Sequence, residues 1–413
     1  MKKKSFADIL CDISDTGAAK MRRKVPQWAD SEGLSFPTQL CTEQCSSSAT
    51  ALYKAGLLSR LDPQDKPEMA SSCGHLPAGY GGFAPTLRVV DLTGGLGVDC
   101  WAFSRIASHV HHNEMDRTLS EAVQANFKAL GVTGVTFSSV EVRPGGSVTR
   151  VLEASGGGAD VIYLDPARRS GTGRKVFLLE DCSPDILSLK DELLAAAPRI
   201  LVKLSPMADV TMVCRRLGTE VKEVHVVGAE GECKELLVLL ERGWSGGYSV
   251  TVRPDCGEGA SITFSPEEEA AAAPALHPGP DSLKSAKMLF EPSPALLKAG
   301  CFSLLCSRLP LVKLGRFTHL YTLPEEEEAV MPYGKLFKIK DILPFNGANV
   351  KALGKSLSKC DVTSRNLPVK SEDLRKKMGV TPGGDTHVFA FQADFGGSPS
   401  EKLLLVCERV IRP

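Results

Sequence analysis

The stretch Val89–Asp99 (VVDLTGGLGVD) joins the end of an apolar segment to a turn that contains three glycines. Val89 and Val90 are typical of the last residues of a buried strand. The glycines let the backbone turn sharply and approach a ligand closely, because they carry no Cβ atom. We therefore expect a strand followed by a ligand-binding loop, with a nucleotide as the ligand.

The spacing of the glycines separates two classes of nucleotide. A dinucleotide-binding loop has the pattern G-x-G-x-x-G, and here Cys100 stands where the third glycine would fall. The pattern D-x-x-x-G-x-G instead resembles the first signature of class I methyltransferases, which bind S-adenosylmethionine. This resemblance assigns four residues to the cofactor site: Asp91, Thr93, Gly95 and Gly97.

A carboxylate stands at the end of the next expected strand. Glu114 follows Asp91 by 23 residues, where an acid can accept hydrogen bonds from both ribose hydroxyls of an adenosine nucleotide. Met115, the next residue, is assigned to the same part of the cofactor site. NAD-binding proteins also carry an acid here, so Glu114 indicates an adenosine nucleotide without identifying it. The missing third glycine and the lack of a pyrophosphate cradle disfavour NAD, since S-adenosylmethionine has no phosphate.

The third expected strand is not followed by the aspartate that holds the adenine amino group in class I methyltransferases. Ser138, Ser139 and Glu141 are the polar residues available there. We assign Ser139 to the adenine contact and keep the other two as alternatives.

The expected strand 159–165 ends in the turn Asp165-Pro166-Ala167-Arg168. This turn resembles the Asp-Pro-Pro-aromatic turn of amino-methylating class I enzymes, where the carboxylate accepts a hydrogen bond from an exocyclic amine and the ring stacks on the base. Asp165 and Pro166 match that pattern, whereas Arg168 replaces the aromatic residue. Base stacking must therefore come from elsewhere, or the target is not an adenine amine. We assign all three residues to the catalytic side, with Asp165 orienting or deprotonating the attacking group.

The turn is also similar to the Asp-Pro-Pro-Arg turn of RNA uracil-5 methyltransferases, which need a cysteine nucleophile after the fifth strand. Leu204 stands where that cysteine would fall, so covalent attack on a pyrimidine is disfavoured. Lys203, the preceding residue, is a further catalytic candidate with two interpretations. Either it contacts substrate or phosphate in the cleft, or it is a lysine at a strand end in solvent.

Segments typical of strands and of helices alternate along residues 88–218, which predicts an α/β fold with a doubly wound, Rossmann-like sheet. The expected strands are 88–92, 109–114, 135–142, 159–165 and 199–205, and the expected helices are 98–107, 116–131, 183–197 and 207–218. Segments 223–232 and 234–242 are too close together for a crossover helix, so we expect them to pair antiparallel at one edge of the sheet.

The composition is that of a globular protein, with 43% hydrophobic and 24% charged residues in 413. No apolar run approaches the roughly 20 residues that span a bilayer, and the basic start MKKKSF soon turns acidic instead of entering an apolar signal core. We therefore expect a cytoplasmic location. The 13 cysteines contain no C-x-x-C pair, so we expect neither a disulfide framework nor a metal site.

Seven motifs in this order resemble a bacterial family of class I methyltransferases with a C-terminal THUMP-like domain: residues 36–56, 89–99, 163–169, 202–209, 231–237, 291–300 and 365–368. THUMP domains proper are RNA-binding modules of enzymes that modify tRNA and rRNA. The resemblance thus implies methylation of RNA, which we expect at a base nitrogen. A non-catalytic protein that binds S-adenosylmethionine and RNA is the alternative, since Arg168 replaces the aromatic residue. In the fifth motif, Glu232, Lys234 and Glu235 are expected to be charges of a hairpin turn rather than of the active-site mouth.

The resemblance also divides the chain into four parts. These are an N-terminal helical extension (1–60), a class I methyltransferase domain (61–265), a linker (266–284) and a mixed α/β THUMP-like domain (285–413). Within the extension we expect one helix over residues 42–56, with Thr42 as its N-cap and Gly56 at its C-terminal end.

Positive charge gathers in residues 335–377, which hold 11 basic and 4 acidic residues although the whole chain has a net charge of zero. Lys351, Lys355 and Lys359 are spaced at i, i+4 and i+8, which is one face of an expected helix. Like charges on one face repel each other, and a polyanion turns that cost into attraction. Residues 335–377 are therefore the expected RNA contact, with an ordinary solvated helix face as the alternative.

Overall fold

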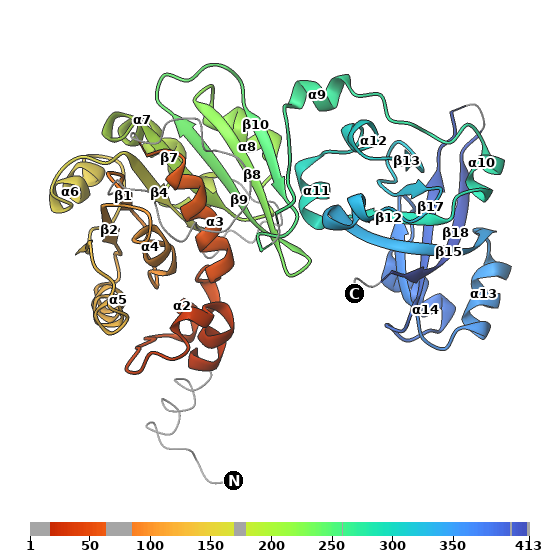
Figure 1. Cartoon of the computed structure of the whole chain (residues 1–413), viewed down its shortest axis with the longest axis horizontal. Helices are drawn as coiled ribbons and strands as arrows, with labels where there is room; N and C mark the ends of the chain where they lie inside the picture. The colour runs from red at the N-terminus through yellow and green to blue at the C-terminus, as the bar shows by residue number, and fades with distance from the viewer. Residues whose placement is uncertain (1–16, 63–84, 169–178, 258, 397–398, 411–413) are drawn as a thin grey trace, which may run out of the picture. The chain divides into compact units, whose positions relative to one another are not determined.

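The computed structural model describes residues 17–62, 85–168, 179–257, 259–396 and 399–410, which belong to two compact units (Figure 1). Unit 1 comprises residues 1–230, 234–251 and 255–259, and unit 2 comprises residues 231–233, 252–254 and 260–413. The first unit therefore contains both the expected N-terminal extension and the glycine loop. No helix in the described ranges is both long enough and apolar enough to pass through a membrane.

The first sheet has nine strands in the order β11-β10-β8-β9-β7-β4-β1-β2-β3. Their bounds are β1 (Arg88–Asp91), β2 (His109–Asn113), β3 (Val135–Ser138), β4 (Val161–Leu164), β7 (Arg199–Leu204), β8 (Val221–Ala229), β9 (Glu232–Glu241), β10 (Ser249–Arg253) and β11 (Ile262–Phe264). Strands β3, β2, β1, β4 and β7 run parallel to one another, and β9 pairs antiparallel with β7. The expected α/β sheet and its antiparallel hairpin are thereby confirmed, and the sheet continues beyond the hairpin with β10 and β11.

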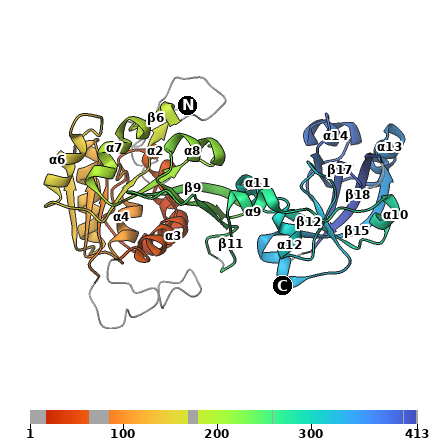
Figure 2. The same cartoon turned by 90° about the horizontal axis from the view of Figure 1, so that it is seen from above.

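Helices of the described residues cover both faces of this sheet (Figure 1, Figure 2). They are α3 (Ser48–Ser59), α4 (Val98–Phe103) and α5 (Arg117–Ala129) on one face, and α6 (Ser147–Ala154), α7 (Ile186–Ala196) and α8 (Val210–Leu217) on the other. Asp116, Asp185 and Asp209 cap α5, α7 and α8 by accepting hydrogen bonds from backbone N–H groups of the first turn. The four residues of β4 are all buried, as expected for a parallel strand covered on both faces.

Helix α6 was not predicted. The sequence indicated only a strand as far as residue 142 followed by the strand 159–165, whereas β3 ends at Ser138 and α6 occupies part of the interval. Glycines flank this eight-residue helix, and Gly146 is its N-cap with a φ of 89°. Glycine-rich flanks are typical of loops, which is why the pattern concealed a short helix.

The prediction of a single helix over residues 42–56 was wrong. The segment contains the ends of two helices, α2 (Gln39–Gln44) and α3, separated by Cys45, whose ψ of 152° is extended. Thr38 caps α2 and Ser47 caps α3, so Thr42 lies inside a helix and not at its start. A run of serines competes for the backbone N–H groups and starts the second helix, which then continues past Gly56.

The extension shares its hydrophobic core with the sheet. Met21, Trp28 and Leu58 are buried in one cluster with strand and helix residues such as Val89 and Phe103. The indole rings of Trp28 and Trp101 meet edge to face, with centroids 6.0 Å apart. Residues 17–61 are therefore packed as part of unit 1.

Unit 2 contains a seven-stranded sheet in the order β13-β14-β12-β15-β18-β17-β16. Its strands are β12 (Met288–Pro292), β13 (Val312–Lys313), β14 (Tyr321–Leu323), β15 (Gly334–Pro344), β16 (Asp361–Arg365), β17 (Thr386–Ala393) and β18 (Glu401–Arg409). Only β16 and β17 pair in parallel among the strand pairs described for this sheet. Alternate residues of β17 enter two cores: Phe389 and Phe391 lie in one, and Val388 and Ala390 in the other, under α13 and α14.

The helices of unit 2 are short: α9 (Pro266–Ala271), α10 (Pro280–Lys284), α11 (Pro294–Ala299), α12 (Leu304–Arg308), α13 (Gly347–Ser356) and α14 (Ser371–Met378). Residues 266–284, expected to be a linker, thus include α9 and α10. They also include the buried His277, whose Nε2 lies 2.7 Å from Oγ1 of Thr322.

The prediction that three lysines share one helical face is wrong for Lys359. Lys351 and Lys355 lie exposed on α13, but the helix ends at Ser356 and Lys359 follows it. Lys359 forms an isolated β-bridge with Thr381, so the chain has already left the helix there.

Candidate functional site

The glycine loop follows β1 at the carboxyl ends of the parallel strands, where open α/β sheets bind ligands. Gly95 and Gly97 adopt φ angles of 53° and 80°, which favour glycine. A Cβ atom on Gly97 would lie 2.7 Å from Cγ1 of Val123, whereas one on Gly95 would meet nothing closer than 3.9 Å. Packing therefore requires Gly97, while Gly95 leaves one side of the loop open.

Glu114 is held beside this loop by two backbone groups. The Gly95 N–H donates to Oε2 of Glu114 at 2.9 Å, and the Asp116 N–H donates to Oε1 at 2.9 Å. An ionised carboxylate has about four acceptor positions, so capacity for further donors remains. Met115, assigned to the same region, is 67% exposed.

Asp91 and Thr93 connect the loop to the strands beneath it. Oδ1 of the buried Asp91 accepts the Thr93 N–H at 2.9 Å, and the Cys100 thiol donates to Oδ2 at 3.1 Å. Burial raises the pKa of Asp91 to about 8, so its carboxyl is largely neutral at pH 7. Thr93 Oγ1 accepts the Asp165 N–H at 2.7 Å, which joins the glycine loop to the turn after β4.

Asn113, which no sequence motif assigns to the site, holds together the ends of three strands. Its Nδ2 donates to the carbonyl oxygens of Leu92 and Val140, and its Oδ1 accepts from Ser138 Oγ at 2.7 Å. Ser138 is therefore engaged within the protein, while Ser139 lies exposed directly after β3. The position of Ser139 leaves its side chain accessible to a ligand.

Asp165 and Lys203 form an ion pair at the ends of β4 and β7. Lys203 Nζ lies 2.5 Å from Asp165 Oδ2, and the two side chains are 13% and 35% exposed. Burial alone would lower the pKa of Lys203, but Asp165, Glu235 and Asp99 together raise it above its ordinary value. The interpretation of Lys203 as a lysine in solvent is therefore wrong.

The turn after Asp165 leads into a small antiparallel ladder. Pro166 is buried, and β5 (Ala167–Arg168) pairs with β6 (Cys182–Ser183). The side chain of Arg168, assigned above to the catalytic side, lies outside the described part of the structure.

A buried network of charges adjoins this ion pair, and most of its members lie outside the residues that the sequence motifs assign to the site. Lys54 of α3 contacts two carboxylates: its Nζ lies 2.7 Å from Glu235 Oε2 and 3.2 Å from Asp99 Oδ1. Tyr163 of β4 donates to Asp99 Oδ2 at 2.8 Å. The hydroxyl of Ser46 lies between the two lysines, 3.2 Å from Lys54 Nζ and 3.4 Å from Lys203 Nζ.

The expectation that Glu235 is a charge of the hairpin turn was wrong. It lies three residues into β9, is only 4% exposed and binds the buried Lys54. One signal in the sequence could have revealed the pair: Lys54 interrupts the apolar face of α3 formed by Ala51, Ala55 and Leu58. A lysine in a buried helix face requires an acidic partner, because an unpaired buried charge is costly.

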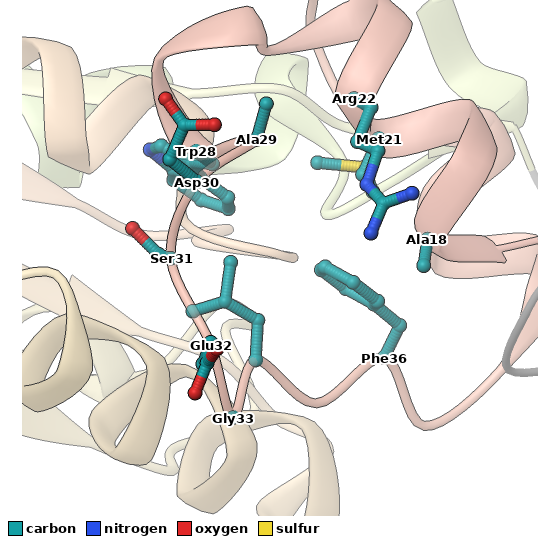
Figure 3. Close-up of a pocket in the computed structure, with 11 residues that line it drawn as sticks. Ala18, Met21, Arg22, Trp28, Ala29, Asp30, Ser31, Glu32, Gly33 and Phe36 are labelled. Atoms are coloured by element: carbon teal, nitrogen blue, oxygen red, sulfur yellow. The ribbon is translucent and has the colours of Figure 1, made fainter.

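A separate pocket of about 470 Å³ lies within the N-terminal extension (Figure 3). Met21 and Phe36 reach into it, Trp28 lines it, and Arg22 and Asp30 stand at its border. None of the assigned site residues lines it, so the cavity is distinct from the glycine loop. In the described ranges, no three His, Cys, Asp or Glu side chains are grouped as a metal ion would need.

Two family models match the C-terminal part of the chain. Residues 334–409 match the THUMP domain-like family, and residues 288–329 match a ferredoxin-like domain. A comparison with curated proteins found no match.

Among solved structures, a protein of Porphyromonas gingivalis W83 described as a "putative methyltransferase" is 28% identical, with a TM-score of 0.75 over 95% of this chain and 88% of that one. Two others match less of the chain, each with a TM-score of 0.30. The S-adenosylmethionine-dependent methyltransferase of Agrobacterium tumefaciens is 16% identical over 54% of this chain and 60% of its own. The tRNA (m1A58) methyltransferase of Aquifex aeolicus is 14% identical over 51% and 72%.

The first of these structures is similar over 95% of this chain, so the match extends over both units. The family model for residues 334–409 accounts for the second sheet separately. The chain therefore combines a methyltransferase-like fold of class I with a C-terminal THUMP-like domain.

Proposed function

We propose that this protein transfers the methyl group of S-adenosylmethionine to RNA, at a base nitrogen. One observation carries the proposal: a hydrogen bond from the Asp165 N–H to Thr93 Oγ1 joins the glycine loop to the turn after β4. The loop binds Glu114, which we assign to the ribose of the cofactor, and the turn carries Asp165, which we assign to the methyl acceptor. The two halves of a methyl-transfer site, one for the cofactor and one for the nucleophile, thus meet at the carboxyl ends of neighbouring strands.

The residues around the loop fit the cofactor. Glu114 has free acceptor capacity for the ribose hydroxyls, and Gly95 presents a side without a Cβ atom for close approach. Ser139 is exposed directly after β3, where we assign the adenine contact. S-Adenosylmethionine, when bound, supplies an electrophilic methyl group on its sulfonium.

Asp165 is suited to orienting the methyl acceptor. Its Oδ2 is bound to Lys203, which leaves Oδ1 for an N–H of the attacking group. We therefore assign Asp165 to holding the nucleophile in line with the methyl group before any proton is removed. The attacking nitrogen then releases its proton only after the methyl group has been transferred, because the methylated nitrogen is more acidic.

RNA as the substrate is supported by the C-terminal unit. The THUMP-like match at residues 334–409 covers the whole of the basic segment 335–377, and Lys351 and Lys355 are exposed on α13. Exposed cations bind a phosphate backbone independently of its sequence. The base and the nucleophile would then be selected by the site in unit 1.

The test starts with RNA from a strain that lacks the protein. Incubating this RNA with the purified protein and methyl-labelled S-adenosylmethionine should label one nucleoside, which mass spectrometry then identifies. The matched control is RNA from the parent strain, which should accept little label. If the protein binds S-adenosylhomocysteine but labels no RNA, the second candidate, a binding protein without catalysis, takes its place; the replacement of the aromatic residue by Arg168 favours that candidate.

A further inference from the structure

We propose that the N-terminal extension is part of the methyl-acceptor site, where Ser46 and Lys54 act as positioning residues for Lys203 and, through it, for Asp165. This inference rests on the proposed function. It assigns a catalytic task to a segment that precedes the glycine loop by some 40 residues and carries no methyltransferase signature.

The hydroxyl of Ser46 uses all of its hydrogen-bonding capacity inside this network. It donates its proton to Asp99 Oδ2 at 2.9 Å and accepts from Lys54 Nζ at 3.2 Å and from Lys203 Nζ at 3.4 Å. A hydroxyl has one donor and two acceptor positions, so no other contact is open to it. Ser46 thus gives the ammonium of Lys203 a second fixed contact besides Asp165.

Lys54 completes the network from the helix face. Its side chain is fully buried and lies between Glu235 of β9 and Asp99 of α4. Lys54 and Lys203 together oppose Asp99, Glu235 and Asp165, so the ionised network carries one negative charge in excess. Lys54 and Lys203 lower the pKa of Asp99 although burial alone would raise it, which keeps that carboxylate charged.

Attachment of the helix does not explain this network. Helix α3 is already held by apolar contacts of Ala51 and Leu58, and by Tyr53, whose hydroxyl lies 2.8 Å from Nδ1 of His225 in β8. Replacing a buried ion pair by apolar residues is often neutral or stabilising. The three buried charges of Lys54, Asp99 and Glu235 are therefore weak evidence for a role in stability. Charges retained at the carboxyl ends of the strands indicate a role in the site.

The first experiment compares Ser46→Ala with Ser47→Ala. Ser47 is the neighbouring N-cap of α3, which accepts the Thr50 N–H at 3.3 Å and lies outside the network. We expect Ser46→Ala to lower kcat for RNA by about 10- to 100-fold, because Asp165 loses its fixed partner. In Ser46→Ala, KM and the Kd for S-adenosylmethionine should stay within about twofold. Ser47→Ala, which loses an N-cap, should keep the wild-type kcat although its Tm falls. Ser46→Thr, which keeps the hydroxyl, should restore kcat.

Two results would overturn the inference: equal kcat in the two alanine variants, or a loss of kcat in Ser46→Ala that parallels losses in cofactor affinity and thermal stability. The second pattern is that of a general structural defect, which Ser46→Thr and the KM values would also show.

A second readout needs no RNA. In protein with ¹⁵N-labelled lysine, the NMR signal of the Lys203 ammonium, assigned with Lys203→Arg, reports how firmly that group is held. We expect its protons to exchange with water about tenfold faster in Ser46→Ala than in Ser47→Ala, and equal exchange would contradict the inference. If wild-type protein methylates no RNA, the proposed function fails, and this exchange rate still decides whether Ser46 holds Lys203.

Discussion

Glu114 and Asp165 are both carboxylates that follow parallel strands, but their surroundings give them different tasks. Glu114 is bound by two backbone N–H groups of the loop region, whereas Asp165 is bound by an ammonium. Backbone donors fix the direction of a carboxylate without neutralising it. The ammonium of Lys203 both fixes and balances the charge of Asp165, which suits a site that receives a polar nucleophile.

Replacing Glu114 by alanine should weaken S-adenosylmethionine binding by about 10- to 100-fold, because a hydrogen bond to a charged acceptor contributes about 1.5 to 3 kcal/mol. Calorimetric titration measures the Kd, with Glu114→Gln as the isosteric control that keeps half of the acceptor capacity. An unchanged Kd in folded Glu114→Ala protein would remove Glu114 from the ribose site.

Replacing Asp165 should affect the acceptor side alone. We expect Asp165→Asn and Asp165→Ala to abolish methyl transfer, since neither keeps a charged oxygen for the nucleophile, while the Kd for the cofactor changes little. Steady-state labelling of RNA and a binding titration on the same samples provide the comparison. Cofactor affinity that falls in step with activity would place Asp165 on the cofactor side.

Asp91 should make the stability of the protein depend on pH. Folding raises its pKa from 3.8 to about 8, so the folded protein keeps a proton that the unfolded chain releases. The contribution of Asp91 to stability is therefore fully present below pH 3.8 and is lost as the pH rises through about 8. Over this interval, Tm should fall faster in wild type than in Asp91→Asn, which does not titrate. Parallel Tm curves for the two proteins would show that Asp91 is ionised in both states.

At the scale of an element, the two glycines of the loop with positive φ angles have different roles: Gly97 is required by packing, whereas Gly95 leaves room for a ligand. Both Gly95 and Gly97 have positive φ angles, but only the environment of Gly97 is closed by Val123 and Phe127. The same residue type thus serves two purposes within three positions.

We expect Gly97→Ala to lower the free energy of unfolding by more than Gly95→Ala. Both variants have strain of about 1 kcal/mol from a positive φ, but only the Cβ atom of Gly97→Ala would also collide with Val123. Gly95→Val should instead weaken cofactor binding, since its side chain would occupy the open side of the loop. Chemical denaturation and cofactor titration of the variants test this division. Wild-type affinity in Gly95→Val would mean that the ligand does not approach there.

Helix α13 allows a test of the RNA contact. Replacing Lys351 and Lys355 by glutamine should reduce the salt dependence of RNA binding by about 0.7 in log–log slope for each lost phosphate contact. Lys359→Gln, beyond the helix end, reports whether the residue contacts RNA independently of the helix. Cofactor affinity should remain that of wild type. A wild-type slope in the variant that lacks Lys351 and Lys355 would leave α13 an ordinary solvated helix.

At the scale of the whole molecule, the sequence predicts what depends on local pattern. The sheet, its hairpin and the position of the glycine loop after β1 follow from periodicity and glycine spacing, and the structure confirms them. The network of Lys54, Asp99 and Glu235 could not be predicted in that way. Its members lie 45 and 136 residues apart along the chain, and only the packing of α3 on the sheet brings them together.

The hydrogen bond from the Asp165 N–H to Thr93 Oγ1 has a consequence for how the two substrates bind. A ligand that orders the loop also orders the turn, so the cofactor and the RNA should favour each other's binding. By thermodynamic reciprocity, the factor by which S-adenosylmethionine tightens RNA binding equals the factor by which RNA tightens cofactor binding. Thr93→Val, which removes the acceptor oxygen and keeps the shape, should reduce this cooperativity in both directions by the same factor.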